Sequence, residues 1–264
     1  MRSLSRLLPL MVLVCATIWA HAASAQITDV NSAINKAGRQ RMLSQRMAKA
    51  FIQMALDVEH DKSKKILDGS IQLFEQQLGE LRAFSPNPLV LETYIRLDQA
   101  WGDYKKLLQK KPSADEAQRV LEASETVLTL AHQGTVLLEK VSGKTQGRLV
   151  NVAGRQRMLS QRLAKFFQAM AYGVAPADAK TQMAQARDEF EKALTELSES
   201  PLNTPELKKQ LDLGRQYWSF FADSLNVSGS KPPKSECSVV AVASERILEI
   251  MNDVTGLYEK LAAQ

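Results

Sequence analysis

The ten residues AGRQRMLSQR occur twice in this chain, at 37–46 and again, letter for letter, at 153–162. Each copy contains three arginines and no carboxylate, so the positive charges need partners from another helix, from solvent or from a bound anion. A guanidinium is planar and presents its N–H donors in a fixed fork, which suits a planar anion with several acceptor oxygens. A bound anion is therefore one of the partners that these arginines could have.

The polar residues of each copy share one face if the segment is helical, because residues three or four apart lie above one another on a helix. A glycine inside a helix costs roughly 1 kcal/mol relative to alanine, and it is tolerated where a backbone or a ligand must approach closely. We therefore expect a small polar pocket on this face. The candidate ligand-binding residues are Gly38, Arg41, Gln45 and Arg46 in the first copy and Gly154, Arg157, Gln161 and Arg162 in the second.

A packing role is the alternative explanation of the repeat. Long arginine side chains commonly extend from a solvated helix face, and a repeated motif can mark the line along which two helices pack. The rest of the chain differs between the copies, whereas the polar residues of the motif are identical. This identity favours the binding interpretation.

The motif resembles a known signature, Asn-x-Ala-Gly-Arg-Gln-Arg-Met-Leu-Ser-Gln-Arg, of the PilJ-type domain. This domain is the N-terminal sensor module of type IV pilus methyl-accepting chemotaxis transducers. The motif is also similar to the P-box of nitrate/nitrite sensor kinases, Ile-Asn-x-Ala-Gly-x-x-Arg-Met-x-Ser-x-Arg. Residues 34–46 and 150–162 both fit that pattern, with Val150 in place of the leading isoleucine. The resemblance covers two consecutive modules, and strong identity is confined to the first helix of each.

The resemblance implies a fold and a ligand. In that family the module is an extracytoplasmic four-helix bundle, and nitrate or nitrite lies between the P-box helices of two protomers, held by one arginine from each. The matching positions here are Arg41 and Arg157. One departure is that nitrate sensors often carry a lysine at the position of Lys36, where the second copy has Val152. Another is that no transmembrane segment, linker helix or signalling domain follows the second module.

Apolar residues at helical spacing continue on both sides of each motif, and they predict helices throughout the chain. In the first half we expect helices at about 28–60, 63–84, 89–110 and 113–141, separated by proline-containing breaks and by a capping box that begins at Ser113. The second half repeats this pattern. The predicted fold class is all-α, with two tandem up-down-up-down four-helix bundles and no strand. Their expected bounds are 26–142 and 143–264.

The junction between the two bundles, Ser142 to Arg148, leaves their arrangement open. It contains Gly143 and Gly147, which weaken a helix without necessarily breaking it. One continuous helix through the junction would hold the bundles end to end. A sharp turn would let them pack side by side and imitate the parallel dimer of the family. Whether the site lies within one chain or between the chains of a homodimer is open for the same reason.

The first 25 residues predict a secretory signal peptide. Arg2 and Arg6 supply its positive end, residues 7–20 its apolar core, and the sequence Ala-Ser-Ala at 23–25 its cleavage site. We therefore expect a periplasmic protein that begins at Gln26. Lipidation at Cys15 is not expected, because its neighbours are poor for a lipoprotein cleavage site. The apolar core is too short to span a bilayer, and no other apolar run approaches the required length.

Composition excludes several classes of function. The net charge is +5 and falls to +3 without the signal peptide, with acidic and basic residues interspersed, so we expect no nucleic-acid partner. Cys237 would be the single remaining cysteine, which allows no internal disulfide. His60 and His132 lack the neighbours of a metal site, and no nucleophile motif or phosphate loop is present. We predict no enzyme, no metal and no cofactor.

Two functions remain from the sequence. The first is a periplasmic sensor or binding protein for a small oxyanion, with nitrate or nitrite as the expected ligand. It would pass its signal to a membrane-bound receptor or kinase, or simply hold the ligand. The second is a structural or adaptor protein of a cell-envelope assembly, such as a pilus or a chemoreceptor. Specific stabilisation by an anion would separate the two.

Overall fold

The computed structural model describes residues 27–226 and 231–263, and the predicted signal peptide, including Cys15, lies outside the described residues. The described part of the chain folds into eight α-helices and contains no strand. They are α1 (Val30–Ala55), α2 (His60–Phe84), α3 (Pro88–Leu108), α4 (Ala114–Ser142), α5 (Thr145–Tyr172), α6 (Ala179–Glu199), α7 (Pro205–Ser224) and α8 (Lys234–Ala262). The all-α class with two tandem four-helix bundles is confirmed.

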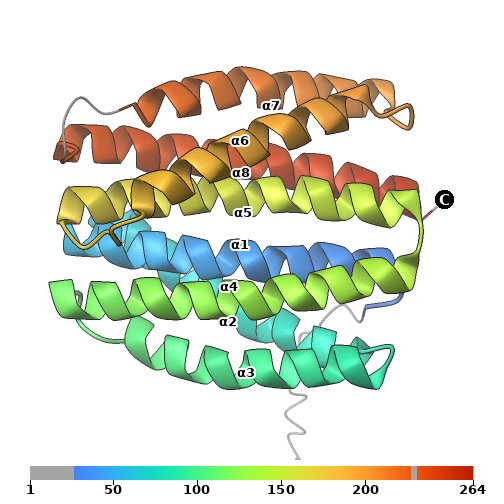
Figure 1. The fold of residues 1–264 in the computed structure, drawn as a ribbon, viewed down its shortest axis with the longest axis horizontal. Coiled ribbons are helices and arrows are strands. Elements are labelled where there is room, and N and C mark those ends of the chain that lie inside the picture. The colour runs from blue at the N-terminus through green and yellow to red at the C-terminus, as the bar shows by residue number, and fades with distance from the viewer. Residues whose placement is uncertain (1–26, 227–230, 264) are drawn as a thin grey trace, which may run out of the picture.

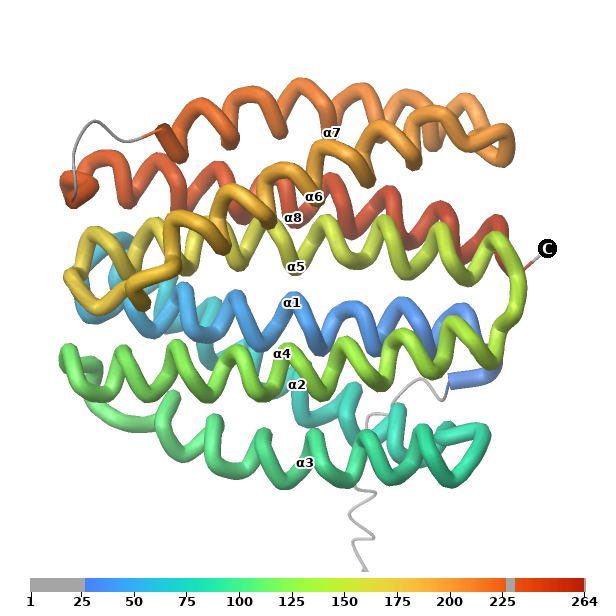
Figure 2. Tube along the Cα trace, viewed as in Figure 1, coloured from blue at the N-terminus to red at the C-terminus, as the bar shows by residue number. Residues whose placement is uncertain are grey.

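The two motif helices, α1 and α5, lie side by side in the middle of the molecule and run in the same direction (Figure 1). Helices α2 and α4 pack against α1 on one side, α6 and α8 pack against α5 on the other, and α3 and α7 lie outermost. Consecutive helices alternate in direction, which the tube in Figure 2 makes easy to follow. The two copies of the motif therefore face each other across the boundary between the bundles.

A sharp turn between α4 and α5 produces this arrangement. Gly143 follows the last residue of α4 with a left-handed φ of +61°, and its N–H donates to the carbonyl of Glu139. Glycine is the usual residue at this position, because it has no Cβ to resist a positive φ. After Lys144 the chain starts α5 at Thr145. The continuous-helix alternative is thereby excluded, and the bundles are packed side by side.

The ends of the helices follow from their capping residues. The Ser113 hydroxyl accepts a hydrogen bond from the N–H of Glu116 (3.3 Å), as the predicted capping box requires. The first helix is shorter than the predicted 28–60. It ends at Ala55, and Asp57 and Glu59 then take positive φ values of 53° and 46°, which cannot continue a right-handed helix.

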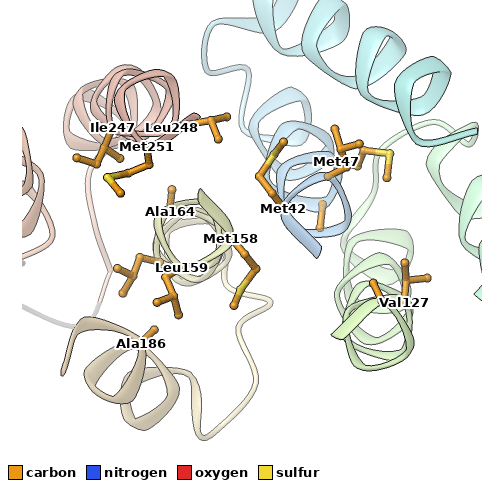
Figure 3. Close-up of a cluster of buried hydrophobic side chains, with 14 of the residues drawn as sticks. Met42, Met47, Val127, Met158, Leu159, Ala164, Ala186, Ile247, Leu248 and Met251 are labelled. Atoms are coloured by element: carbon orange, nitrogen blue, oxygen red, sulfur yellow. The ribbon is translucent and has the colours of Figure 1, made fainter. Parts of the chain in front are cut away.

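Each bundle has an apolar core with the same aromatic centre. Phe74 and Trp101 stack in the first bundle at a centroid distance of 4.2 Å, and Phe190 and Trp218 stack in the second at 3.8 Å. Met42 and Met47 of α1 and Met158 of α5 are buried in the core (Figure 3). None of the described helices combines the length and the apolar character of a membrane span.

Candidate functional site

Helices α1 and α5 bury an unusual number of polar side chains. Three positions of α1, Arg41, Gln45 and Lys49, have no solvent exposure, and neither do their counterparts on α5, which are Arg157, Gln161 and Lys165. Charged residues are rarely buried without partners, because leaving water is costly for them. The partners of these side chains therefore show which buried charges at the boundary between the bundles are satisfied by the protein and which could bind a ligand.

The two predicted arginines come together, and we call Arg41 and Arg157 the arginine pair. A methyl group added to Gly38 would lie 3.2 Å from Arg41 Nη2 and 3.3 Å from Arg157 Nη2. Added to Gly154, it would lie 3.0 Å from Arg157 Nη2. The two glycines thus leave the space into which both guanidiniums fold. The structure brings these four predicted residues to one place.

Each guanidinium of the pair crosses to the opposite motif helix. Arg41 Nη2 donates to the side-chain Oδ1 of Asn151 at 2.7 Å and to its carbonyl at 3.3 Å. Arg157 Nη2 donates to the carbonyl of Asn35 at 3.1 Å. Since Asn35 and Asn151 are themselves equivalent positions of the repeat, the contacts are related by an approximate two-fold axis between α1 and α5.

The other edge of each guanidinium contacts the fourth helix of a bundle, α4 or α8. The residue that it contacts differs between the two bundles. Arg41 Nη1 lies 3.3 Å from Nδ1 of His132 on α4. Arg157 Nη1 donates to Oδ1 of Asn252 on α8 at 3.1 Å. His132 and Asn252 are outside the motif and were not among the predicted site residues. Their 120-residue spacing, which other residues of α4 and α8 share, is the signal that could have identified them.

The arginine pair has no direct acidic partner among the described residues, and the charges of Glu139, Glu189 and Glu259 act on it from further away. Within residues 27–226 and 231–263, neither guanidinium forms an ion pair with a carboxylate. Burial, and then the charge of Arg155, lower the pKa of Arg41 to about 9. Burial and the charges of Arg39 and Arg41 hold the pKa of Arg157 well below its usual value. Because arginine keeps its proton in proteins, these shifts mean that the buried charges are held at a cost in free energy.

The remaining predicted residues lie further along the motif helices. The Gln45 and Gln161 amides donate to backbone carbonyls of α4 and α8, Ser124 at 3.2 Å and Ser244 at 2.8 Å. Both Oε1 atoms are buried and have no donor. These glutamines lie one turn beyond the pair and fix the outer helices to α1 and α5.

Arg46 and Arg162 do not join the arginine pair in this structure. Arg46 pairs with Glu245 of α8 at 2.5 Å, and Arg162 pairs with Glu125 of α4 at 2.7 Å. In both cases the carboxylate belongs to the other bundle. These two arginines thus have a partner from another helix, one of the sources expected for the charges of the motif.

Two buried lysines that were not predicted as site residues strengthen the same contacts. Lys49 Nζ lies 2.5 Å from Glu245, and Lys165 Nζ lies 2.5 Å from Glu125. Burial raises the pKa of Glu245, but the neighbouring charges of Lys49 and Arg46 outweigh it and lower that pKa to about 2. The boundary therefore consists of a central arginine pair and a reciprocal set of ion pairs at one end.

A family model described as "Type IV pili methyl-accepting chemotaxis transducer N-term" (PilJ) matches residues 22–127 and 142–233. The chain belongs to the PilJ family. Both matched regions contain one copy of the motif, so the PilJ domain is present in tandem. No curated protein and no solved structure matches the chain. PilJ domains are sensory domains of chemotaxis transducers, which are membrane receptors, and the family is not catalytic.

Proposed function

We propose that this protein is a periplasmic sensor or binding protein for nitrate or nitrite, with the anion held between α1 and α5 by the arginine pair. The observation that carries the proposal is the convergence of two fully buried guanidiniums over Gly38 without a carboxylate partner. Two positive charges that both lie next to Gly38 in a poorly hydrated site repel each other strongly. A planar oxyanion would neutralise both and accept hydrogen bonds from both forks.

A bound anion would also change how α1 and α5 pack. Arg41 and Arg157 currently donate across the boundary to Asn151 and Asn35. An anion that takes over some of these N–H groups releases asparagines of the opposite helix, so ligand binding is coupled to the packing of the two bundles. We propose that a membrane-bound receptor or kinase reads this change, since PilJ domains belong to chemotaxis transducers. Because both arginines come from one chain, the site does not require a homodimer.

Thermal unfolding in nitrate, with chloride at equal ionic strength as the control, tests the proposal. Binding stabilises the folded state by RT ln(1 + [L]/Kd), about 2.7 kcal/mol at a hundredfold excess of ligand over Kd. At roughly 2–4 °C per kcal/mol for a protein of this size, the nitrate-specific increase in Tm is several degrees. Arg41→Ala and Arg157→Ala should each abolish it, because the site is shared.

Arg148→Ala is the matched control variant. Arg148 also lies on α5, but its side chain is half-exposed and pairs with Glu196 at the surface. The nitrate-specific increase in Tm should survive this substitution. Equal shifts in nitrate and chloride that are unchanged in both pair variants would contradict the proposal and favour a structural or adaptor role for the protein.

A further inference from the structure

A cavity of about 320 Å³ opens between α4, α5 and α6. This volume is at the lower end of the range for small-molecule sites and is far larger than a four-atom oxyanion requires. The residues around it are Arg41, Glu125, Leu128, Thr129, His132, Arg155, Met158, Leu159, Arg162, Gln182, Gln185, Ala186 and Glu189. Arg41 therefore borders both the boundary between the bundles and this cavity.

The α6 side of the cavity is polar where the equivalent helix of the first bundle is mostly apolar. The polar residues are Gln182, Gln185 and Glu189. The residues 116 positions earlier, on α2, are Ile66, Gly69 and Leu73. Ile66 and Leu73 pack against the apolar core. A cavity that was only a packing defect would not need this exchange of apolar for polar residues, so the lining indicates a polar ligand.

The contacts of two equivalent glutamines show that α6 stands further from α5 than α2 does from α1. Gln40 of α1 donates to the carbonyl of Phe74 on α2 at 3.4 Å. Gln156 occupies the same position on α5, is fully buried, and has no hydrogen-bond partner for either amide atom. The separation of α6 thus costs hydrogen bonds, and it leaves room for the cavity between α4, α5 and α6.

The charges around the cavity favour an anion. Three arginines and two glutamates leave one positive charge in excess. Arg155 pairs with Glu189, and Arg162 pairs with Glu125. Arg41 has no carboxylate partner, and its Nε is buried without an acceptor. In the described part of the chain, Arg41 is therefore the arginine of the cavity wall that has no direct carboxylate partner.

We propose that this cavity is a second ligand site, which binds a small organic monocarboxylate that carries a further hydrogen-bonding group, such as a hydroxycarboxylate. The carboxylate would lie at the end of the cavity next to Arg41, whose fully buried guanidinium attracts it through its charge. The hydroxyl would meet the amide of Gln185, since the Gln182 amide already bonds Arg162 and Asp178. The apolar part would contact Met158 and Leu128. This inference shares Arg41 with the proposed nitrate site, but it does not depend on nitrate binding.

Lactate is a suitable probe, and lactamide is its uncharged counterpart of nearly equal shape. Titration calorimetry of the full-length protein with each compound should show saturable binding of lactate and at least tenfold weaker binding of lactamide. Thr129→Glu adds a negative charge at an exposed position on the cavity and reproduces the residue found 120 positions later, Glu249. It should weaken lactate binding about tenfold, as expected for one like charge a few ångströms away in a partly hydrated site.

Thr126→Glu is the matched control, because Thr126 is also exposed on α4 and does not line the cavity. Lactate affinity should be unchanged in this variant. Arg157→Ala separates the two sites, since Arg157 does not line the cavity: it should abolish the nitrate-specific increase in Tm and leave lactate binding intact. The inference is overturned if lactate shows no saturable binding at millimolar concentrations, if lactamide binds equally well, or if Thr126→Glu weakens binding as much as Thr129→Glu.

Discussion

The two bundles are most alike where they touch each other and least alike where they face outward. Along the boundary, Arg41 and Arg157 make reciprocal contacts, and so do Lys49 and Lys165. One layer further out, His132 of the first bundle corresponds to Asn252 of the second. The comparison teaches that the duplicated chain preserved the contacts that need both copies, while positions that serve one copy were free to change.

The second helix of each bundle shows the difference most clearly. α2 packs apolar side chains against α1, whereas α6 presents polar side chains to a cavity beside α5. Symmetry at the arginine pair is thus combined with asymmetry around it. The proposed anion site would therefore have two different sides, which a site between two identical chains would not have. Four predictions test how far this comparison holds.

The largest effect is expected at the reciprocal ion pairs. Lys49→Met leaves Glu245, whose side chain is 14% exposed, with one fewer buried partner, and it should lower the free energy of unfolding by about 3–4 kcal/mol. Lys165→Met should cost about 2 kcal/mol, since Glu125 is 36% exposed and better hydrated. Urea unfolding of both variants measures the difference. A greater loss of unfolding free energy for Lys165→Met would show that the exposure of the carboxylate does not determine how much each ion pair contributes to stability.

The second prediction concerns a difference in core packing. A Cβ on Gly134 of α4 would lie 2.9 Å from the buried ring of Tyr94, so Gly134→Val should destabilise the protein by about 2–3 kcal/mol. The repeat places Leu211 and Val254 at the corresponding positions of the second bundle. Adding Tyr94→Leu to Gly134→Val should therefore recover at least half of the loss in thermal unfolding. Losses that simply add would refute this compensation between the two positions.

The third prediction concerns pH. Burial, followed by the charges of Arg41 and Arg155, lowers the pKa of His132 to about 4 from an ordinary value of 6.5. As the pH falls from 6.5 to 4, the unfolded chain gains a proton that the folded chain does not, and the folded state loses stability. His132→Asn, which copies Asn252, should remove about 1 kcal/mol of this loss, a value reduced because His132 is only half-buried.

The measurement is the difference in unfolding free energy between wild type and His132→Asn across this pH range, with His60→Asn as the control for removing a histidine. His60 lies at the exposed start of α2, with its Nδ1 3.5 Å from the carboxylate of Asp61. The same pH dependence of the unfolding free energy in wild type and His132→Asn would mean that the buried His132 does not destabilise the protein at low pH.

The smallest effect is expected from making α6 resemble α2. The double variant Gln182→Ile, Glu189→Leu copies Ile66 and Leu73 and should stabilise the fold by about 1 kcal/mol, because apolar area replaces polar area facing the core. The ion pair of Glu189 with Arg155 is partly exposed, so its loss costs little. Lactate binding should disappear in the same variant. A clear loss of stability would indicate that the polar lining of the cavity serves the fold.

The sequence alone predicts much of the fold and half of the site. Helical periodicity and proline breaks are local signals, and they were sufficient for the helices and the bundle architecture. The direction of the second bundle was not predictable, because it depends on the φ of Gly143, for which the sequence allowed two outcomes. The first helix was extended too far because nothing local marks the positive φ of Asp57.

The site shows the same division. Gly38 and Arg41 could be identified because they are repeated, and repetition is visible without a structure. His132 and Asn252 could be aligned through the 120-residue spacing of α4 and α8, but their types differ between the copies, so nothing in the sequence placed them beside the arginines. The roles of Lys49 and Lys165 also required the fold, since their carboxylate partners come from the opposite bundle.

The turn at Gly143 and Lys144 has a consequence for the amount of protein that the cell must make. When a site is formed by two separate chains, dilution makes the chains dissociate and the site is lost. The fraction of chains that carry a complete site then depends on the copy number of the chain. Here the halves are joined through a two-residue connection, which keeps their effective concentration high and constant. The arginine pair therefore forms by a first-order event within each molecule, equally complete in a cell with few copies of the protein and in one with many.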